Sequence, residues 1–445
     1  MSYPSSAIPR SISAIAFLCI LAGVLSAADQ SPIQSPSPPA FGDSLRIETV
    51  VSQVLKTNDK AAAARYMEIS AMAKIGPAGA WDDPMLMVGV ANLPTSFKFN
   101  EDMMTMKMVG LSQKIPYAGQ KGLQAKAARA EAEASAMDRD EIERELALAA
   151  RLAFFEWYYQ ARIVEDMKVQ RSLMADMVAA ATANLTANQA GQADVAMAQA
   201  DLWRMDAEIL TMEQMVDEAR YMLCALMGLP TNTILPPPAQ PPTASVPDAP
   251  DSWITAANVN YPVSKRMERQ ADGYGFSAAS MRRMRWPMLE LSASYGFRAD
   301  FPMEEPKNMV GFQATFSLPF FSGHRQGDMA RSMESMQLSM DAEASQTRRE
   351  VEAEIKTLHA KAQRLSQSLA LYTERIIPAD NDGYQSMLAS YAANRMTLTD
   401  LLESAMTIYR DHIAARRQAY ELARTMAEIE KYVSGPLAPT PAAKQ

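Results

Sequence analysis

Residues 309–320 read MVGFQATFSLPF, and this stretch decides the fold class of the chain. Apolar and polar residues alternate along it and along residues 289–297, LELSASYGF, so each segment is expected to be a strand with one apolar face. In the first segment the apolar positions are Val310, Phe312, Ala314, Phe316 and Leu318. Strands of about ten residues with this pattern are typical of transmembrane barrels. A half-buried hairpin on a soluble core would alternate in the same way.

A weaker form of the alternation lies in the first half of the chain. Met104, Met106 and Met108 alternate there with Thr105, Lys107 and Val109. We expect these residues to form a second hairpin with a strand that carries Met85 and Met87. The polar segments 92–102 and 299–308 would then be the loops that connect the strands of the two hairpins.

The two hairpins belong to a unit that occurs twice. A shift of 203 positions places Pro84-Met85-Leu86 on Pro287-Met288-Leu289. The halves are joined by a tract with eight prolines, which can be neither helix nor central strand. The sequence therefore predicts a first repeat at 44–229, a proline-rich linker at 230–251 and a second repeat at 252–434.

Each repeat is expected to contain a helix, a β-hairpin, a very long helix and a medium helix. The helical stretches are 44–75, 119–185 and 192–227 in the first repeat, and 252–285, 323–389 and 397–433 in the second. No proline lies between Tyr117 and Leu229, and strong helix formers dominate there. A helix of about 67 residues would be on the order of 100 Å long, and the two shorter helices could run end to end beside it. A long soluble coiled coil would need the same helices.

The hairpins favour a membrane protein over that alternative. Separated by long helices, they have no other apolar layer of comparable size to pack against. Four strands cannot close a barrel, because the smallest natural barrels use about eight and open edges are not tolerated in lipid. The chain is therefore expected to oligomerise, most simply as a trimer with twelve strands.

The N-terminus is expected to be a secretory signal peptide, residues 1–28. Arg10 precedes the apolar run 12–25, which ends in the small residues 26–28. Residues 29–43 and 435–445 would be flexible ends of the mature chain. Cys19 lacks the small preceding residue of an acylated cysteine and would be removed, which leaves Cys224 as a small core residue.

The sequence shows no arrangement that supports an enzyme or a cofactor. His324, His359 and His412 are isolated, and no His-Glu-x-x-His motif, phosphate loop or paired cysteine motif occurs. The 43 basic and 51 acidic residues give a net charge of −8, which does not indicate a nucleic-acid partner.

The chain resembles the TolC outer-membrane efflux family over nearly its whole mature length, and the most specific residues lie in its last part. Ile376-Ile377-Pro378-Ala379, Tyr391 and Leu401-Leu402-Glu403 are similar to the Pro-Ala, Tyr-x-x-Gly and Leu-Leu-Asp motifs of that family. Asn394 stands at the usual glycine, and asparagine also tolerates left-handed geometry. Residues 83–94 and 113–121 resemble the heavy-metal efflux branch typified by CusC and CzcC.

The resemblance implies a homotrimer in the outer membrane, with a twelve-stranded β-barrel on a twelve-helix periplasmic α-barrel. It implies a passive channel that works with a periplasmic membrane-fusion adaptor and an inner-membrane pump, of which the RND type is favoured. Heavy-metal cations such as Cu/Ag or Zn/Co are the favoured substrates. A type I protein-secretion or drug-efflux duct would share all features except the heavy-metal-like motifs. A soluble periplasmic coiled-coil adaptor or scaffold is the alternative of another class.

Two sets of residues are candidates for sites at the ends of the helices. The resemblance places the adaptor-docking tips at the turns with Asn188, Gly191, Gln192, Asn394 and Arg395. Asp194 and Asp400 follow these turns, and rings of carboxylates can bind cations and narrow a pore. The alternative is that both aspartates are ordinary solvated helix residues.

Methionine is unusually frequent, with 33 residues. Its thioether is a soft ligand that suits Cu(I) or Ag(I). The candidate contacts are those on the first hairpin, Met85, Met87, Met103, Met104, Met106 and Met108. The alternative is that methionine fills apolar positions where leucine would also serve.

Overall fold

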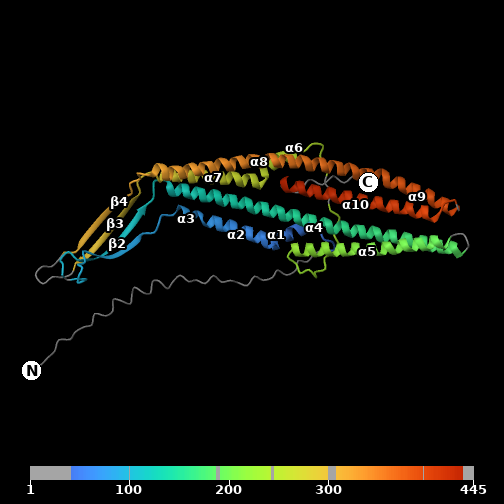
Figure 1. Ribbon diagram of the computed structural model, residues 1–445, viewed down its shortest axis with the longest axis horizontal. Coiled ribbons are helices and arrows are strands. Elements are labelled where there is room, and N and C mark those ends of the chain that lie inside the picture. Colours follow the sequence, from blue (N-terminus) through green and yellow to red (C-terminus); the bar gives the residue numbers. More distant parts are fainter. Residues whose placement is uncertain are drawn as a thin grey trace, which may run out of the picture. The chain divides into compact units, whose positions relative to one another are not determined.

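The computed structural model describes residues 42–99, 101–186, 191–241, 245–298, 307–393 and 395–433, all within one compact unit. They are mainly helical with a small antiparallel sheet, so the expected combination of long helices and β-hairpins is confirmed (Figure 1). No helix of these residues is long and apolar enough to cross a membrane. The expected signal peptide and the chain ends at 29–41 and 435–445 lie outside the described residues.

The order of helices and strands in the two halves is similar. The first half contains α1 (Ile47–Thr57), α2 (Asp59–Ala73), α3 (Ile75–Gly79), β1 (Met85–Ala91), β2 (Met106–Ile115), α4 (Gln120–Thr186) and α5 (Gln192–Leu226). The second contains α6 (Asp251–Asn260), α7 (Pro262–Arg283), β3 (Leu289–Arg298), β4 (Met309–Phe316), α8 (Ser322–Leu371), the π-helical turn η1 (Tyr372–Ile376), α9 (Ile377–Ala392) and α10 (Leu398–Val433).

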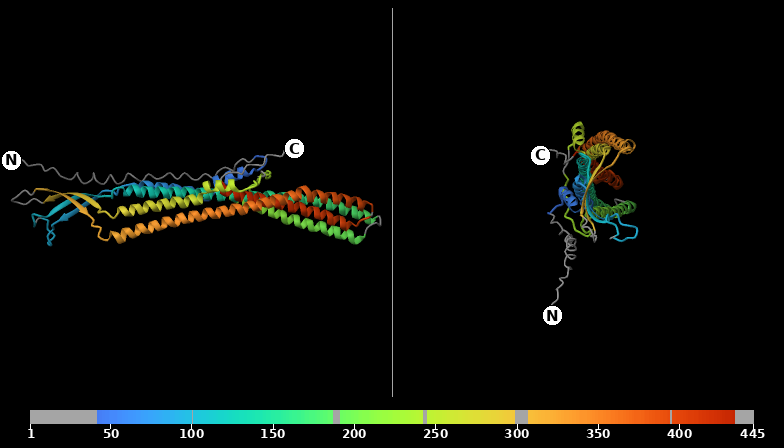
Figure 2. Two further views of the ribbon diagram at one scale, coloured as in Figure 1. Left: turned by 90° about the horizontal axis from the view of Figure 1, so that it is seen from above. Right: turned by 90° about the vertical axis from the view of Figure 1, so that its left-hand side faces the viewer.

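The longest helix organises the first half. α4 is continuous over 67 residues because no proline interrupts its helix-forming sequence. α1, α2 and α3 pack along one part of α4, and α5 packs along the rest (Figures 1 and 2). In the second half, α7 and α10 pack along α8 and α9 in a similar way. The expected end-to-end placement of shorter helices beside a long one is therefore present.

Three of the expected helices are interrupted. The expected helix 44–75 divides at Asn58, whose side chain accepts a hydrogen bond from the Lys60 N–H and caps α2. The expected helix 252–285 divides before Pro262, which lacks an N–H and begins α7. The second long helix contains η1 just before Pro378, where the extra residue of a π-turn accommodates the proline ring. The long helix of the first half has no such interruption.

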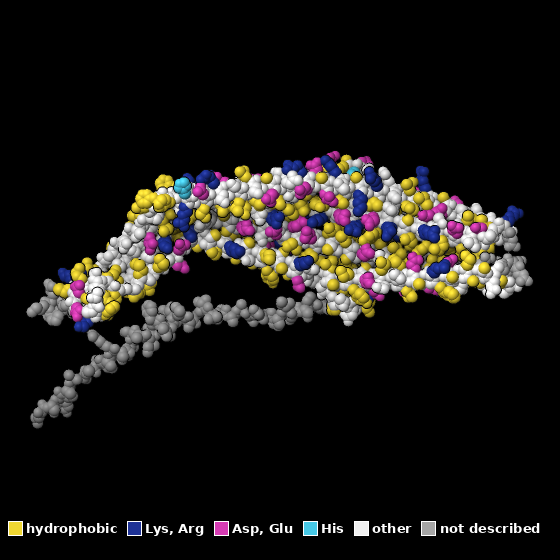
Figure 3. All heavy atoms as spheres, viewed as in Figure 1, with side chains coloured by type: hydrophobic (Ala, Val, Ile, Leu, Met, Phe, Trp, Pro, Cys, Tyr) yellow, Lys and Arg dark blue, Asp and Glu magenta, His cyan; other side chains and the backbone are white. Residues whose placement is uncertain are grey.

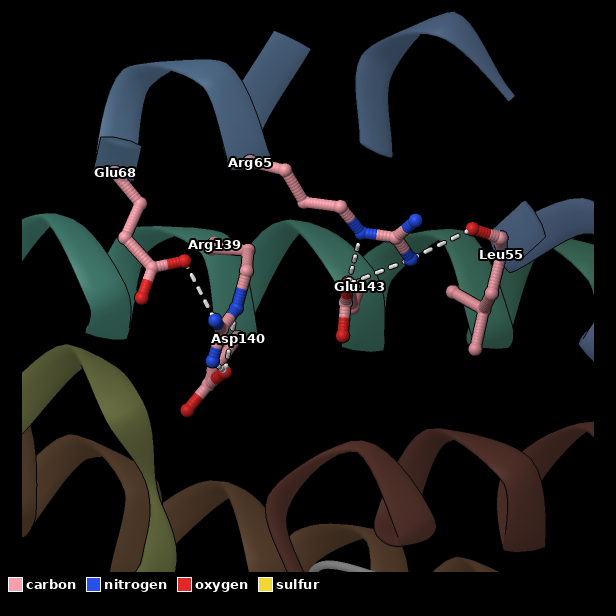
Figure 4. Close-up of polar contacts among 6 residues, drawn as sticks. All are labelled: Leu55, Arg65, Glu68, Arg139, Asp140 and Glu143. Atoms are coloured by element: carbon pink, nitrogen blue, oxygen red, sulfur yellow. Dashed lines mark hydrogen bonds and ion pairs between the residues drawn. The ribbon is translucent and has the colours of Figure 1, made fainter. Parts of the chain in front are cut away.

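Ion pairs attach α2 to α4. Arg65 Nη2 lies 3.1 Å from Glu143 Oε1 and also donates to the Leu55 carbonyl oxygen at 2.9 Å (Figure 4). One turn along α4, Arg139 Nη1 lies 2.6 Å from Glu68 Oε2. Because these charges are partly exposed, they fix the alignment of the helices more than they stabilise them.

Buried side chains of the described residues form three clusters along the helices. The first joins α1, α4 and α5 around the fully buried Phe154 and includes Cys224, which is buried as expected. The second joins α4, α5, α9 and α10, and includes Met167, Met174, Met177 and Met205. These methionines act as core residues.

The third cluster, which joins α6, α8 and α10, explains one of the isolated histidines. It includes Trp253, Ile355 and Ile429. His359 is buried beside it, with Nε2 2.7 Å from the Pro247 carbonyl oxygen and its ring edge against Trp253. His359 is therefore a packing residue of the core.

The proline-rich tract after α5 is held against the segment that precedes α1. The Leu45 N–H donates to the Pro237 carbonyl oxygen at 2.9 Å, and the Ala239 N–H donates to the Leu45 carbonyl oxygen at 2.8 Å. These two hydrogen bonds form an isolated parallel bridge. The proline-rich segment cannot form a regular ladder, because proline has no N–H to donate.

All four strands form one antiparallel sheet in the order β1-β2-β3-β4. The two hairpins are joined because β2 pairs with β3 along its full length. β4 ends at Phe316, four residues before the end of the expected alternating segment at 320. The Ser317 N–H makes the last bond, to the Met288 carbonyl oxygen, and Pro319 then has no N–H to donate.

Candidate functional site

The strand register gives the sheet two chemically different faces. Leu86, Leu111, Ala293 and Phe312 are direct partners across the four strands, and so are Val88, Val109, Tyr295 and Val310. Between these two apolar rows, on the opposite face, lies the row Met87, Gly110, Ser294 and Gly311. Each apolar row occupies the same face because directly paired residues point the same way.

The apolar face has no cover within the described part of the chain. Leu86 is 66 % exposed, Val310 60 % and Phe312 83 %. The helices lie beyond the end of the sheet and not over its faces (Figures 1 and 2). An apolar layer of this kind indicates a surface that contacts another apolar phase or another chain.

Among the described residues, nothing pairs with either edge of the sheet. β1 and β4 each pair on one side only, so a row of backbone N–H and carbonyl groups remains free along each. Free edges are templates for pairing with another strand. The described sheet is therefore a segment that further strands could extend at both sides.

The strand register corrects which residues of the first hairpin we expected on the apolar face. Met106 and Met108 do not belong to the apolar face, which takes the intervening Val109 instead. Met85, Met87, Met106 and Met108 all lie on the polar face, where their direct partners include Gly89, Gly110, Ser112, Gly296 and Arg298. We call these four residues the methionine patch. Met103 and Met104 precede β2 and are exposed.

The sequence analysis missed a fifth methionine on this face, Met309, which is the direct partner of Gly296. Arg298 Nη2 lies 2.8 Å from Met309 Sδ and 3.8 Å from Met104 Sδ. Met106 Sδ lies against Gly296, where an added Cβ would approach it to 2.7 Å. The sequence shows only the alternation within each strand. It does not reveal which residues are partners on different strands.

At the far end of the helices, the candidate tip residues flank the starts of α5 and α10. Gly191, Gln192 and Arg395 are exposed. Both helix starts belong to the second buried cluster, through Ala198 and Leu398, so the two turns lie at the same end of the bundle (Figure 1). Asn188 and Asn394 lie outside the described residues.

Each of the two candidate gate residues lies in the first turn of a helix. Asp194 lies in the first turn of α5. Asp400 is exposed in the first turn of α10, where its Oδ2 accepts a hydrogen bond from Thr397 Oγ1 at 2.6 Å. The Asp400 N–H donates to Thr397 Oγ1 at 3.2 Å, and the Thr397 N–H donates to Asp400 Oδ2 at 3.4 Å. These reciprocal bonds form a capping box, which gives Asp400 a local structural role beside its predicted one.

Comparison with solved structures places this architecture among known proteins. The outer-membrane channel OprN is 16 % identical, with a TM-score of 0.72 over 87 % of this chain and 90 % of that one. CusC is 15 % identical, with a TM-score of 0.75 over 90 % and 96 %. The MtrE outer-membrane channel of Neisseria gonorrhoeae is 15 % identical, with a TM-score of 0.72 over 90 % and 94 %.

The chain has the TolC-like fold. No protein-family profile matches its sequence, and no curated protein matches it. In this TolC-like chain, the part that the structure describes contains no group of three or more His, Cys, Asp or Glu side chains placed to hold a metal ion.

The inner contacts of the TolC-like helices include a pair of carboxyl groups between α9 and α10. Partial burial raises the pKa of Asp411, and the Asp380 carboxyl beside it raises that pKa further, while His412 lowers it. The folded chain therefore binds the proton of Asp411 more tightly than the unfolded chain does. Stability should fall as pH rises from the ordinary aspartate range through the raised pKa.

Asp411→Asn is expected to remove this pH dependence. The amide keeps the shape of the side chain without an ionisable proton, so the variant should match the wild type at low pH and be more stable at neutral pH. The check is the melting temperature from pH 3 to pH 8. Asp382→Asn, a change to another aspartate of α9, is the control and should leave the profile unchanged. A wild-type melting temperature that rises relative to Asp411→Asn over this range would contradict the assignment.

Proposed function

We propose that this chain is the outer-membrane channel component of a tripartite efflux system, with its sheet in the outer membrane and its helices in the periplasm. The observation that carries the proposal is the four-stranded sheet with an uncovered apolar face and two free edges. A soluble coiled-coil scaffold offers no reason for such a surface. The channel conducts passively and is not an enzyme.

The free edges favour a homotrimer. Four strands cannot close, but β1 of one copy can pair with β4 of the next, and three copies supply twelve strands. The long helices of three copies would continue as a twelve-helix tube below the barrel. Closure removes every free edge, as lipid requires.

The methionine patch lies on the face that closure turns inward. With lipid outside, the face with Ser294, Gly110 and Gly311 lines the lumen, and the four thioethers line it too. Soft thioether ligands in the lumen support heavy-metal cations, Cu(I) and Ag(I) above all, as substrates. The alternative is a type I secretion or drug-efflux duct, in which these side chains would serve as flexible lining.

The tips of the helices are the proposed docking surface for a membrane-fusion adaptor, which would link the channel to an inner-membrane pump of RND type. Gly191, Gln192 and Arg395 are exposed there, and Asn188 and Asn394 belong to the same proposal. Asp194 and Asp400 are proposed as the gate. For the signal peptide, the two repeats and the linker we propose the boundaries that the sequence predicts.

Deletion of the gene, followed by growth with copper, silver, zinc, cobalt and a panel of drugs, tests the function and its cargo. We expect sensitivity to metals, restored by the wild-type gene. The variant M85L/M87L/M106L/M108L should restore silver and copper tolerance less well, because leucine keeps the volume and removes the soft ligand. The control M197L/M222L/M329L/M336L changes four exposed methionines of the helices and should restore tolerance fully.

The outcomes separate the parts of the proposal. Sensitivity to drugs alone would contradict the metal assignment. Equal rescue by both methionine variants would contradict a role for the patch. Recovery of the protein in the soluble periplasmic fraction would overturn the channel itself.

A further inference from the structure

Cationic side chains gather where β3 and β4 meet α7 and α8. Arg283 ends α7, Arg285 lies in the turn that follows, and Arg325 lies in the first turn of α8; all three are exposed. Arg282, next to them, pairs with Glu334. No carboxylate of the described residues pairs with the other three arginines. Their charge is therefore available to a ligand.

Exposed apolar side chains adjoin these arginines. Trp286 is 68 % exposed, and Phe320 and Phe321 are each 81 % exposed. Figure 3 shows Lys and Arg side chains beside a hydrophobic patch at the junction of the sheet and the helices. We call the group Arg283, Arg285, Trp286, Phe320, Phe321 and Arg325 the collar. Large aromatic side chains beside cations are the composition of a membrane–water interface.

The first half of the chain shows that the fold does not require the collar. The shift of 203 positions places Arg285 on Asp82, Arg325 on Gly122 and Arg283 on Ala80. The carboxylate of Asp82 lies 3.1 Å from Lys121 Nζ, so its charge is matched within the chain. The same junction between strand and helix is thus built once with these three arginines and once with Ala80, Asp82 and Gly122 in their places.

The local geometry holds one of the arginines, Arg285, against the start of α8. Arg285 Nη2 lies against Gly327, where an added Cβ would approach it to 2.5 Å. Glycine at this position leaves room for the guanidinium beside the first turns of α8, which also carry Arg325. α8 has no side-chain cap, so its free N–H groups add positive potential there. Guanidinium groups in this setting suit a phosphate oxyanion.

We infer that the collar binds the headgroups of anionic phospholipids in the leaflet that faces the helices. This inference rests on the proposed function, which places the sheet in a membrane. The apolar face of β3 and β4 leads directly to the collar, so a lipid can lay its acyl chains on the sheet and its phosphate at the arginines. A soluble anion would leave the aromatic residues without a partner.

Lipid retention by the purified oligomer tests the inference. The full-length protein in detergent is incubated with equal amounts of phosphatidylglycerol and phosphatidylcholine, and bound lipids are counted by native mass spectrometry. The wild type should retain phosphatidylglycerol preferentially. Each arginine near an anionic lipid contributes about fivefold in affinity, so R283Q/R285Q/R325Q should lower that preference at least about tenfold. The control R364Q/R410Q/R417Q removes three exposed arginines of α8 and α10 and should keep it.

Asp82→Arg provides the reciprocal test. It places an arginine at the matching position of the first half and should raise phosphatidylglycerol retention above that of the wild type. Equal retention of the two lipids by the wild type, or an equal loss in the control variant, would overturn the inference. Displacement of phosphatidylglycerol by inorganic phosphate, but not by chloride of the same ionic strength, would assign the collar to a free anion instead. Pore formation in planar bilayers is measured in parallel: pores without lipid preference overturn the collar alone, and absence of pores overturns the proposed function.

Discussion

Arginine at Phe312 is expected to prevent stable assembly in the outer membrane, whereas arginine at the next residue, Gln313, is expected to be tolerated. Phe312 lies near the middle of β4 on the apolar face and is 83 % exposed. If that face contacts lipid, an arginine there costs about 2–4 kcal/mol in each chain. Gln313 lies on the opposite face, paired with Ser292, where a charge would meet water.

The two variants form a matched pair because they place the same charge on adjacent residues of one strand. The measurements are the amount of protein in the outer-membrane fraction, the heat-modifiable mobility of the oligomer and its conductance in planar bilayers. Phe312→Arg should fail in the first two. Gln313→Arg should assemble and alter only the ion selectivity of the pore. If Gln313→Arg fails and Phe312→Arg assembles, the two faces are reversed, and the methionine patch then faces lipid.

Truncation of Phe154 to alanine is expected to lower the free energy of unfolding by about 3–5 kcal/mol. The side chain is fully buried at the centre of the first cluster, with its ring 6.4 Å from the rings of Phe155 and Trp157. The cavity would lie between α4 and the fully buried Val50 and Leu223 of α1 and α5. Long helices cannot move inward locally to fill it, because each is held by contacts along its whole length.

Denaturant unfolding followed by circular dichroism measures this effect. The control is Val169→Ala on the same helix, where the side chain is 73 % exposed and the change should stay within about 0.5 kcal/mol. A similar shift of the unfolding midpoint in both variants would show that the first cluster does not hold α4 to its neighbours.

The helices are the part of the fold that local sequence determined best. The expected helix 119–185 is found at Gln120–Thr186, and the expected helix 397–433 at Leu398–Val433. Both lie in segments where intrinsic propensity and the absence of proline act in the same direction over many residues. Helix propensity also predicted one continuous helix around Pro378. The structure instead contains a π-turn there, which depends on how the proline ring fits against the preceding turn.

The candidate tip and gate residues were found by resemblance, and local sequence adds a physical reason for one of them. Thr397 and Asp400 have the spacing of a capping box, which the structure contains. The adaptor contact and the gate remain predictions.

By itself, the sequence determined the helices and the alternation of the strands. It also determined that four strands need further copies of the chain to close a barrel. Alternation has a period of two and is readable within one strand. Only the tertiary structure decided that β2 pairs with β3, and with it the face on which each methionine lies. A shift of one residue in that pairing would move every side chain to the other face. Partners from distant parts of the chain, such as Arg298 with Met104 and Arg285 with Gly327, are brought together by packing, which no local pattern records.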